Sequence, residues 1–380
     1  MKFRNQSWVK AVNYIFLLTF SFSCKEKDGS LNLGDSLQLT QASIDTLFID
    51  SGDELIQAAV KFELVSKLED DKFLYHWDQN NSILEVIDLE NLALTNRIPF
   101  EIEGPNGTGT NPFSHFQMLS ESEFILSNPF RVMFFNMEGK KLQEIDLYEE
   151  KLRKAFSEVG APRILHFDEA TSDTYGFQVG FKKFNPSLNR FNLENYQGSV
   201  NPLPKFNALD NYRLLYESKN GMDMKVHLPT LHFNPLKNKI LITSEAISGL
   251  YVYDMGSKSL QYHELDSQVA PSDRRFEAFD TIKEFDEWQQ LILEMEKEFN
   301  YGKLLFDQEN NKYLRLLYRK ISEDKFQIFI SEYSTEFELT KEYQIKEPLK
   351  KPKNEFIKDG AIWLYQNFDD ELAFIKLSIQ

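Results

Sequence analysis

The sequence is poor in cysteine, with Cys24 as its single example among 380 residues. An internal disulfide is therefore excluded, and the fold must be stabilised by packing and hydrogen bonding. The apolar run Ala11–Phe20 is too short for a membrane-spanning helix, which takes about 20 apolar residues, and it contains Asn13. This run therefore does not predict a transmembrane segment.

Motifs of several enzyme classes are also missing. There is no G-x-S-x-G sequence for an activated serine, and His263-Glu264 lacks the second histidine of a zinc-protease helix. Cys24 lies too close to the amino terminus for a catalytic role. Paired carboxylates remain conceivable among 59 acidic residues, but no particular pair is indicated. The sequence predicts no catalytic residue, no cofactor and no resident metal.

Basic residues are outnumbered, with 43 Lys and Arg against 59 Asp and Glu and a net charge of −16. This balance argues against nucleic-acid binding, which needs clustered positive charge, and against adsorption to an anionic membrane through protein charge alone. What the chain has in abundance is aromatic side chains, with 33 Phe and 16 Tyr. Such a composition favours a large β-rich core.

The amino-terminal residues predict export. Lys2, Arg4 and Lys10 precede the apolar run, and small residues follow at Ser21 and Ser23. We assign residues 1–23 to a signal peptide, residues 24–36 to a polar tether and residues 37–380 to the folded domain. A cysteine at this place resembles the lipid-attachment residue of bacterial lipoproteins, although Ser21 stands where leucine is usual. Ordinary cleavage after Ser23 is the alternative.

The stretch Asn111–Leu147 indicates the architecture. Turn residues divide it into four short apolar-rich runs: Phe113–Met118, Glu123–Ser127, Arg131–Asn136 and Lys140–Asp146. Four short strands joined by tight turns form a small antiparallel sheet that needs neighbours to bury its faces. The stretch therefore predicts one copy of a repeated unit.

Further copies follow the same spacing. The best match is Leu231–Leu265, and the others are Val60–Phe100, Arg163–Gly180, Lys303–Ile345 and Glu355–Gln380. The last copy supplies three strands, and a strand in Leu37–Ile49 is expected to complete its sheet and close the ring. We predict an all-β fold, a β-propeller of six blades. Seven blades is the alternative, if Phe181–Tyr216 contains a degenerate copy.

Two helices interrupt the repeats. Tyr148–Val159 and Asp280–Phe299 carry apolar residues at helical spacing, and Asp280 is the expected N-cap of the second. We expect both helices to pack their apolar faces on the sheets between repeats. A partner-binding or capping helix over one mouth of the ring is the alternative for Asp280–Phe299.

Three histidines occupy equivalent places. His115, His166 and His232 each precede a phenylalanine at the start of a repeat, so they are expected near the central channel. They are candidate ligand contacts, either as ordinary half-buried side chains or as a converging metal site. Gly104, Asn106 and Gly107 belong to a glycine-rich loop that lacks the lysine and the helix of a phosphate-binding loop. We interpret it as a connection between repeats, with ligand contact as the alternative.

Two segments carry a family resemblance: Glu103–Gly107 leading to RVMFFNMEGKKLQEI (131–145), and YGKLLFDQENNKYLRLLYR (301–319). The chain resembles TolB-like six-bladed β-propellers, and it is similar to a Bacteroidota lipoprotein family named domain of unknown function 4221. The resemblance covers most of residues 37–380 and implies a propeller fold and a lipoprotein of the periplasm or cell surface. It implies no catalytic residues.

These observations predict a non-enzymatic binding module. Its expected location is the outer membrane, facing the periplasm or the cell surface, where lipid on Cys24 would hold it. An envelope protein or a glycan is the expected partner. The alternatives are a propeller enzyme acting on carbohydrate or peptide at the channel mouth, and a structural subunit of an envelope complex.

Overall fold

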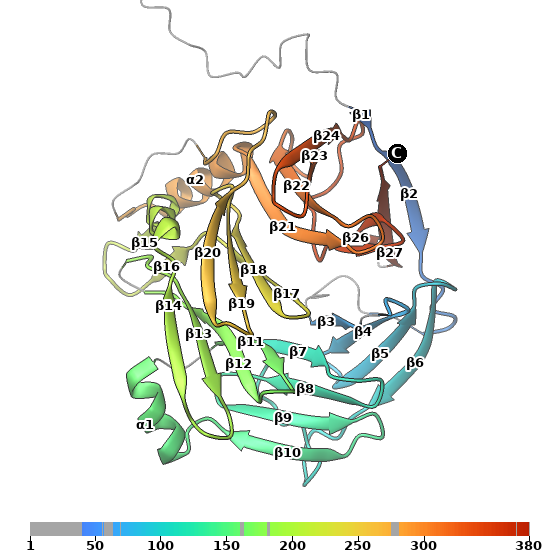
Figure 1. Cartoon of the computed structure of the whole chain (residues 1–380), viewed down its shortest axis with the longest axis vertical. Helices are drawn as coiled ribbons and strands as arrows, with labels where there is room; N and C mark the ends of the chain where they lie inside the picture. Colours follow the sequence, from blue (N-terminus) through green and yellow to red (C-terminus); the bar gives the residue numbers. More distant parts are fainter. Residues whose placement is uncertain are drawn as a thin grey trace, which may run out of the picture. The chain divides into compact units, whose positions relative to one another are not determined.

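A computed structural model describes residues 40–54, 56, 64–68, 70–159, 163–180, 183–274, 281–369 and 371–379 of the chain (Figure 1). The chain divides into two units, Met1–Gln38 and Leu39–Gln380, and all described residues belong to the second. The predicted signal peptide, Cys24 and the tether as far as Ser36 lie outside the described residues. The second unit is a six-bladed β-propeller with few helices, as the sequence predicts.

Each blade is an antiparallel sheet whose strands follow the chain order. Blade 1 comprises β3 (Val65–Lys67), β4 (Phe73–Asp78), β5 (Ile83–Asp88) and β6 (Ala93–Pro99). Blade 2 comprises β7 (His115–Met118), β8 (Glu123–Ser127), β9 (Arg131–Asn136) and β10 (Lys141–Asp146). Blade 3 comprises β11 (Arg163–Asp168), β12 (Asp173–Gln178), β13 (Ser187–Asn192) and β14 (Gly198–Pro202).

The second half of the ring repeats this order. Blade 4 comprises β17 (Leu231–Leu236), β18 (Lys239–Ser244), β19 (Gly249–Asp254) and β20 (Ser259–Glu264). Blade 5 comprises β21 (Asn300–Asp307), β22 (Lys312–Lys320), β23 (Phe326–Tyr333) and β24 (Leu339–Gln344). Blade 6 comprises β25 (Phe356–Lys358), β26 (Ala361–Phe368) and β27 (Glu371–Ser378). The strands of blade 2 match the predicted runs to within two residues, and blade 4 coincides with the predicted copy Leu231–Leu265.

Blade 6 is completed from the amino-terminal side of the domain. Strand β2 (Ser43–Phe48) pairs antiparallel with β27, with Ser43 opposite Ser378 and Phe48 opposite Ala373. The short β1 (Thr40–Gln41) pairs parallel with β24 of blade 5. The predicted closure of the ring by a strand from Leu37–Ile49 is therefore confirmed.

The alternative of a seventh blade is wrong. Most of Phe181–Tyr216 belongs to blade 3, because β13 and β14 complete the sheet that β11 and β12 begin. The remainder forms the 3-10 helix η1 (Pro204–Tyr212) and β15 (Leu214–Glu217), which pairs with β16 (Met224–His227) as a two-stranded hairpin. Because the connection between β12 and β13 is long, the regular spacing of the repeats did not reveal that β13 and β14 belong to blade 3.

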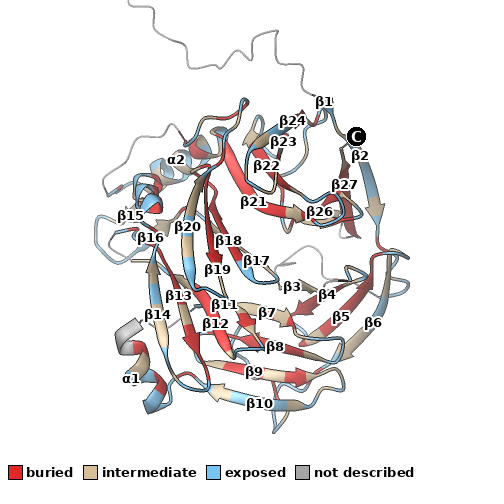
Figure 2. Cartoon of the chain, in the orientation of Figure 1, coloured by how far each residue is buried: buried red, intermediate tan, exposed pale blue. Residues whose placement is uncertain are grey.

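The core is divided among the junctions between blades. Six apolar clusters each join two neighbouring blades, and the cluster of blades 6 and 1 contains Phe374 and Ile87. The middle strands are buried on both faces, whereas most residues of an outer strand such as β10 are exposed (Figure 2). This pattern follows from the architecture, since each inner sheet has a sheet on either side.

Both predicted helices are present. Helix α1 (Glu150–Val159) packs Leu152 and Phe156 between blades 2 and 3, and the rings of Phe156 and Phe191 lie 4.6 Å apart. Helix α2 (Phe285–Lys297) begins later than expected, with Glu284 at the N-cap and no side-chain cap bond, so the N-cap assignment to Asp280 is wrong. Asp280 itself lies outside the described residues. Met295 of α2 is buried in the cluster between blades 3 and 4.

Polar side chains join the inner strands of neighbouring blades. Gln117 of β7 both donates to the carbonyl of Phe167 and accepts from its amide, each at 2.9 Å. His232 of β17 contacts the carbonyl of Tyr301 at 2.9 Å, and Asn234 donates to that of Leu304 at 2.7 Å. Because these two contacts advance together along both strands, β17 and β21 run in the same direction. The first strands of successive blades are thus held by side chains rather than by backbone pairing.

The order and direction of the strands determine at which of the two ends of the ring each connection lies. In each blade, the connection from the second to the third strand emerges at the same end as the connection to the next blade. We call this end the insertion face. Helix α1, η1, the β15–β16 hairpin and α2 all lie in connections between blades, and therefore in connections of the insertion face.

Candidate functional site

The three predicted histidines all lie on inner strands, but they do not meet at one point. His115 contacts the side chain of Gln117 at 3.3 Å, and His166 stacks on Tyr175 with ring centroids 6.2 Å apart. His232 contacts the Tyr301 carbonyl. In the described part of the chain, no three His, Cys, Asp or Glu side chains are arranged to hold a metal. The converging three-histidine metal site is therefore not formed.

The first two histidines share a low affinity for protons. The pKa of His115 is lowered to about 4, chiefly by burial and to a smaller extent by the nearby His166 and Arg163, against the raising effect of the Gln117 contact. Burial likewise lowers the pKa of His166 to about 4, against a smaller opposing effect of Asp168. Both imidazoles are therefore neutral at pH 7 and act as hydrogen-bonding and packing groups.

These shifts predict a loss of stability in acid. The folded pKa of about 4 lies below the ordinary value of 6.5, so the unfolded chain binds protons that the folded chain excludes. The contribution of these neutral histidines to the free energy of unfolding is therefore fully present above pH 6.5, and it decreases as the pH drops towards 4. We expect a loss of about 2 kcal/mol per histidine between pH 7 and pH 5.

Urea unfolding at the two pH values measures this loss. The double variant His115→Gln/His166→Gln should lose markedly less stability between pH 7 and pH 5 than the wild type. An equal loss in both proteins would show that these imidazoles are not the acid-sensitive groups.

The glycine-rich loop is held by its own backbone. Gly104 has φ +92°, and a Cβ at Gly107 would lie 2.6 Å from the carbonyl oxygen of Ile102. The amide of Gly107 donates to the Gly104 carbonyl at 3.0 Å, and the Asn106 side chain accepts from the amide of Lys141 at 3.2 Å. These contacts give Gly104, Asn106 and Gly107 a structural role at the start of β10. A ligand contact of this loop stays a prediction.

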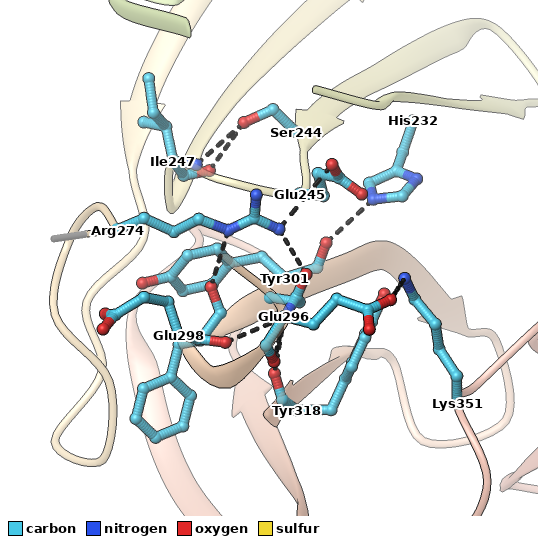
Figure 3. A network of polar contacts seen from close by, with 12 residues as sticks. His232, Ser244, Glu245, Ile247, Arg274, Glu296, Glu298, Tyr301, Tyr318 and Lys351 are labelled. Atoms are coloured by element: carbon cyan, nitrogen blue, oxygen red, sulfur yellow. Dashed lines mark hydrogen bonds and ion pairs between the residues drawn. The ribbon is translucent and has the colours of Figure 1, made fainter. Parts of the chain in front are cut away.

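A network of charged and polar side chains lies on the insertion face beside blades 4 and 5 (Figure 3). Its members are His232, Glu245, Arg274, Glu296, Asn300 and Lys351, and we call it the polar network. Glu245 comes from the β18–β19 connection, Arg274 from the segment after β20, and Lys351 from the connection between blades 5 and 6. The polar network therefore brings together connections that are distant in the sequence.

Arg274 holds the centre of the polar network. Its Nε donates to the Phe299 carbonyl at 3.2 Å, and its second terminal nitrogen donates to the side chain of Asn300 and lies 3.7 Å from Glu245. Asn300 in turn donates to the carbonyl of Glu298 at 2.9 Å. Arg274 is only 4% exposed, so these contacts fix its guanidinium rigidly.

A second ion pair group lies at the end of α2. Glu296 contacts Lys320 at 2.8 Å and Lys351 at 3.2 Å. Lys320 belongs to β22, and Lys351 lies in the connection between β24 and β25. Glu296 therefore anchors the helix to blade 5 and to the segment leading into blade 6. The carboxylate of Glu296 thus positions Lys351, which is a partly exposed member of the polar network.

The carboxylates of this region are ionised although they are buried. Burial alone would raise the pKa of Glu245, but the positive charge of Arg274 and further contributions from His232 and Lys351 hold it below its usual value. The pKa of Glu355 is also held below its usual value. Burial alone would raise this pKa, but the positive charge of Lys303 lowers it, and the Glu355 side chain accepts a hydrogen bond from the backbone amide of Lys303 at 3.1 Å. Burial lowers the pKa of His232.

His232 contacts a carbonyl and His115 an amide, rather than a hydroxyl group that would serve as a nucleophile. A neutral imidazole with a lowered pKa is a weak base. Sequence reasoning missed Glu245, Arg274, Glu296, Lys351 and Glu355. The one local signal was Glu245, a charge in a tight turn between two apolar strands.

The comparisons with known proteins agree with the fold. The model of the family "Domain of unknown function (DUF4221)" matches residues 36–344, which is more than half of the chain. No curated protein matches the sequence. The family model matches blades 1 to 5 and ends where β24 ends, before the three carboxyl-terminal strands of blade 6.

Solved structures resemble the chain at low sequence identity. A DUF4221 protein of Bacteroides vulgatus matches with TM-score 0.63 and 13% identity, covering 90% of this chain and 99% of its own. A candidate exported protein of Bacteroides fragilis matches with TM-score 0.43 and 11% identity, covering 89% and 95%. The first of these similarities supports the propeller fold, and neither assigns an activity to the chain. No helix among the described residues has the length and apolar character needed to cross a bilayer.

Proposed function

The chain belongs to the DUF4221 family, and we propose that it is an exported, lipid-anchored β-propeller that binds a partner on its insertion face without catalysing a reaction. One observation carries the proposal. The inserted elements α1, η1, β15–β16 and α2 all lie in connections of the insertion face, where the polar network also lies. Loops held by a rigid scaffold are the usual location of binding residues.

The anchor part of the proposal rests on the amino-terminal sequence. A basic start, an apolar run and small residues precede Cys24, the single cysteine of the chain. A lipid on this cysteine would explain why an exported protein keeps one thiol. The polar tether after it would allow the propeller to reach a partner at a distance from the membrane.

Replacing Cys24 with alanine tests the anchor. We expect the wild-type protein in the membrane fraction and Cys24→Ala in the soluble fraction, because the variant has no thiol to acylate. A Ser21→Leu variant is the matched control, since it restores the usual residue of the signal and should remain in the membrane fraction. Continued membrane association of Cys24→Ala would contradict lipid anchoring.

Site-specific cross-linking in cells tests the binding face. A benzophenone side chain is placed at Lys353 or Asp223, which are exposed in connections of the insertion face. The control position is Glu138, exposed in the turn between β9 and β10 at the opposite end of the ring. Adducts that form from Lys353 or Asp223 but not from Glu138 support the proposal. Adducts from Glu138 alone, or none at all, contradict it.

The enzyme and the structural subunit proposed from the sequence remain alternatives with weaker support. The charges of the polar network already satisfy one another, as the contacts of Glu296 and Arg274 demonstrate. A reacting carboxylate would need a free partner or a shifted proton affinity in the opposite direction. We therefore prefer the binding module.

A further inference from the structure

A pocket on the insertion face lies between the β15–β16 hairpin and the start of α2. Its volume is about 420 Å³, within the range of small-ligand sites. The walls comprise Tyr216, Ser218, Lys219, Asn220, Lys283, Glu284, Phe285 and Asp286. Building on the proposed function, we propose that this pocket binds a neutral saccharide unit of an oligosaccharide.

The pocket is held in shape by several contacts between the hairpin and the helix. Ile282 adds to the edge of β15, where the amide of Glu217 donates to its carbonyl at 3.0 Å and its own amide donates to Leu215 at 2.8 Å. Ion pairs join Lys219 to Glu284 and Lys283 to Glu217. These links reduce the freedom that a ligand would otherwise have to restrict on binding.

Both lysines of the pocket are already neutralised by a carboxylate. Each of its two lysines is paired with a carboxylate, Lys219 with Glu284 and Lys283 with Glu217. A strongly charged ligand would have to break one of these pairs and leave a charge without its partner. The pairing therefore disfavours a phosphate or a polyanion, which would also meet the carboxylate of Asp286, unpaired among the described residues.

Three polar groups of the wall are free to meet a ligand. Within the described residues, neither the hydroxyl of Tyr216, nor the side-chain nitrogen of Asn220, nor the carboxylate of Asp286 has a hydrogen-bond partner. The side-chain oxygen of Asn220 is already used, since it accepts from Ser218 at 2.7 Å and from the amide of Met222 at 3.1 Å. These groups match the hydroxyl groups of a sugar, which both donate and accept. The amide of Asn220 donates, the carboxylate of Asp286 accepts, and the phenol of Tyr216 does both.

Aromatic rings supply the second requirement. Tyr216 and Phe285 lie with ring centroids 5.4 Å apart, and Phe285 stacks on Trp288 at 5.8 Å. Lys225 lies 4.2 Å above the Phe285 ring and helps to fix it. A pyranose has an apolar C–H face and a polar rim, so a wall that alternates aromatic and hydrogen-bonding groups suits both.

Binding is tested with the full-length lipidated protein in nanodiscs and a panel of defined oligosaccharides. Neutral trisaccharides of glucose, mannose, xylose and N-acetylglucosamine form one arm, and trigalacturonate is the acidic arm. Ligand-observed NMR and calorimetry detect binding. Tyr216→Ala and Asn220→Asp should each weaken binding at least tenfold, and the control Glu138→Ala should leave it unchanged. Asn220→Asp keeps the oxygen that the turn uses, so it separates lost binding from lost folding.

The outcomes separate this inference from the proposed function. Binding of a neutral trisaccharide that both pocket variants weaken supports the saccharide site. Binding of the acidic arm alone, binding unchanged by the variants, or no binding by the panel would overturn it. In that case a cross-linked adduct at Lys353 would still support a binding module, whereas the absence of every adduct would remove both conclusions.

Discussion

Replacing Arg315 with alanine is expected to lower the free energy of unfolding by about 3–5 kcal/mol. Arg315 of β22 is fully buried. It donates to the carbonyls of Gly302 at 2.9 Å and Ser244 at 3.0 Å, and it lies 5.1 Å from the centre of the Tyr301 ring. Alanine would remove the Arg315 donor from both carbonyls, leaving Gly302, among the described residues, only the long contact from the Thr243 hydroxyl at 3.5 Å, and would open a cavity between blades 4 and 5.

The charge of Arg315 is unusual in its surroundings. Burial lowers its pKa to about 10, so the guanidinium remains protonated at pH 7. Among the described residues no carboxylate forms an ion pair with it. Carbonyl dipoles and tyrosine rings stabilise the cation instead. Lysine at this position could not reach the same set of acceptors, so Arg315→Lys is expected to be destabilising as well.

Urea unfolding of three variants checks the explanation. Arg315→Met keeps most of the volume and removes the donors, so it should lose less stability than Arg315→Ala. Arg319→Ala is the control on the same strand, where the side chain contacts Gln327 at 3.1 Å and is partly exposed. Its loss should be about 1 kcal/mol or less. A loss for Arg315→Ala no greater than for Arg319→Ala would contradict the role assigned to Arg315.

A disulfide between Ser43→Cys and Ser378→Cys is expected to raise the free energy of unfolding by about 3–5 kcal/mol. These serines are paired residues of β2 and β27, at the closure of the ring, and they are 335 positions apart in the sequence. Paired residues of antiparallel strands have Cα separations of about 4.5–5.5 Å, which suits disulfide geometry. The gain comes from restricting the unfolded chain.

The measurement compares oxidised and reduced protein in a Cys24→Ala background, so that no third thiol competes. The oxidised form should unfold at higher urea concentration, and a reductant should return the midpoint to that of the parent. A matched pair at Ile44→Cys and Ser378→Cys is out of register and should form the bond poorly. No difference between oxidised and reduced Ser43→Cys/Ser378→Cys would contradict the pairing of β2 with β27.

Short-range patterns predicted much of this fold. Turn residues such as Asn128-Pro129 and Glu138-Gly139 divide blade 2 correctly, because each strand is short and each turn is local. Blade 3 was harder, since its middle strands are separated by a longer connection. The start of α2 was also missed, because Glu284 occupies the N-cap without a side-chain bond that a sequence would reveal.

The polar network could not have been predicted in the same way. Glu245, Arg274 and Lys351 lie in three different connections, and only the closed ring brings them together. No motif relates their positions along the chain. The histidines were placed correctly on inner strands, but their distance from one another depends on the blades that carry them. The pocket of Tyr216 and Phe285 likewise joins two insertions that the repeat pattern leaves undefined.

The closure of the ring by β2 also determines when the domain can complete its folding. Strand β2 is made near the start of the domain and β27 at its end, so β2 has no partner until the whole domain has been made. Pairings so distant in sequence form slowly, because a long loop must be closed before any contact rewards it. An incomplete chain therefore has an open ring, with β27 absent and the apolar faces of its terminal blades uncovered. In the exported protein proposed above, this delay would keep the polypeptide unfolded and able to pass through a translocation channel until its transport is finished.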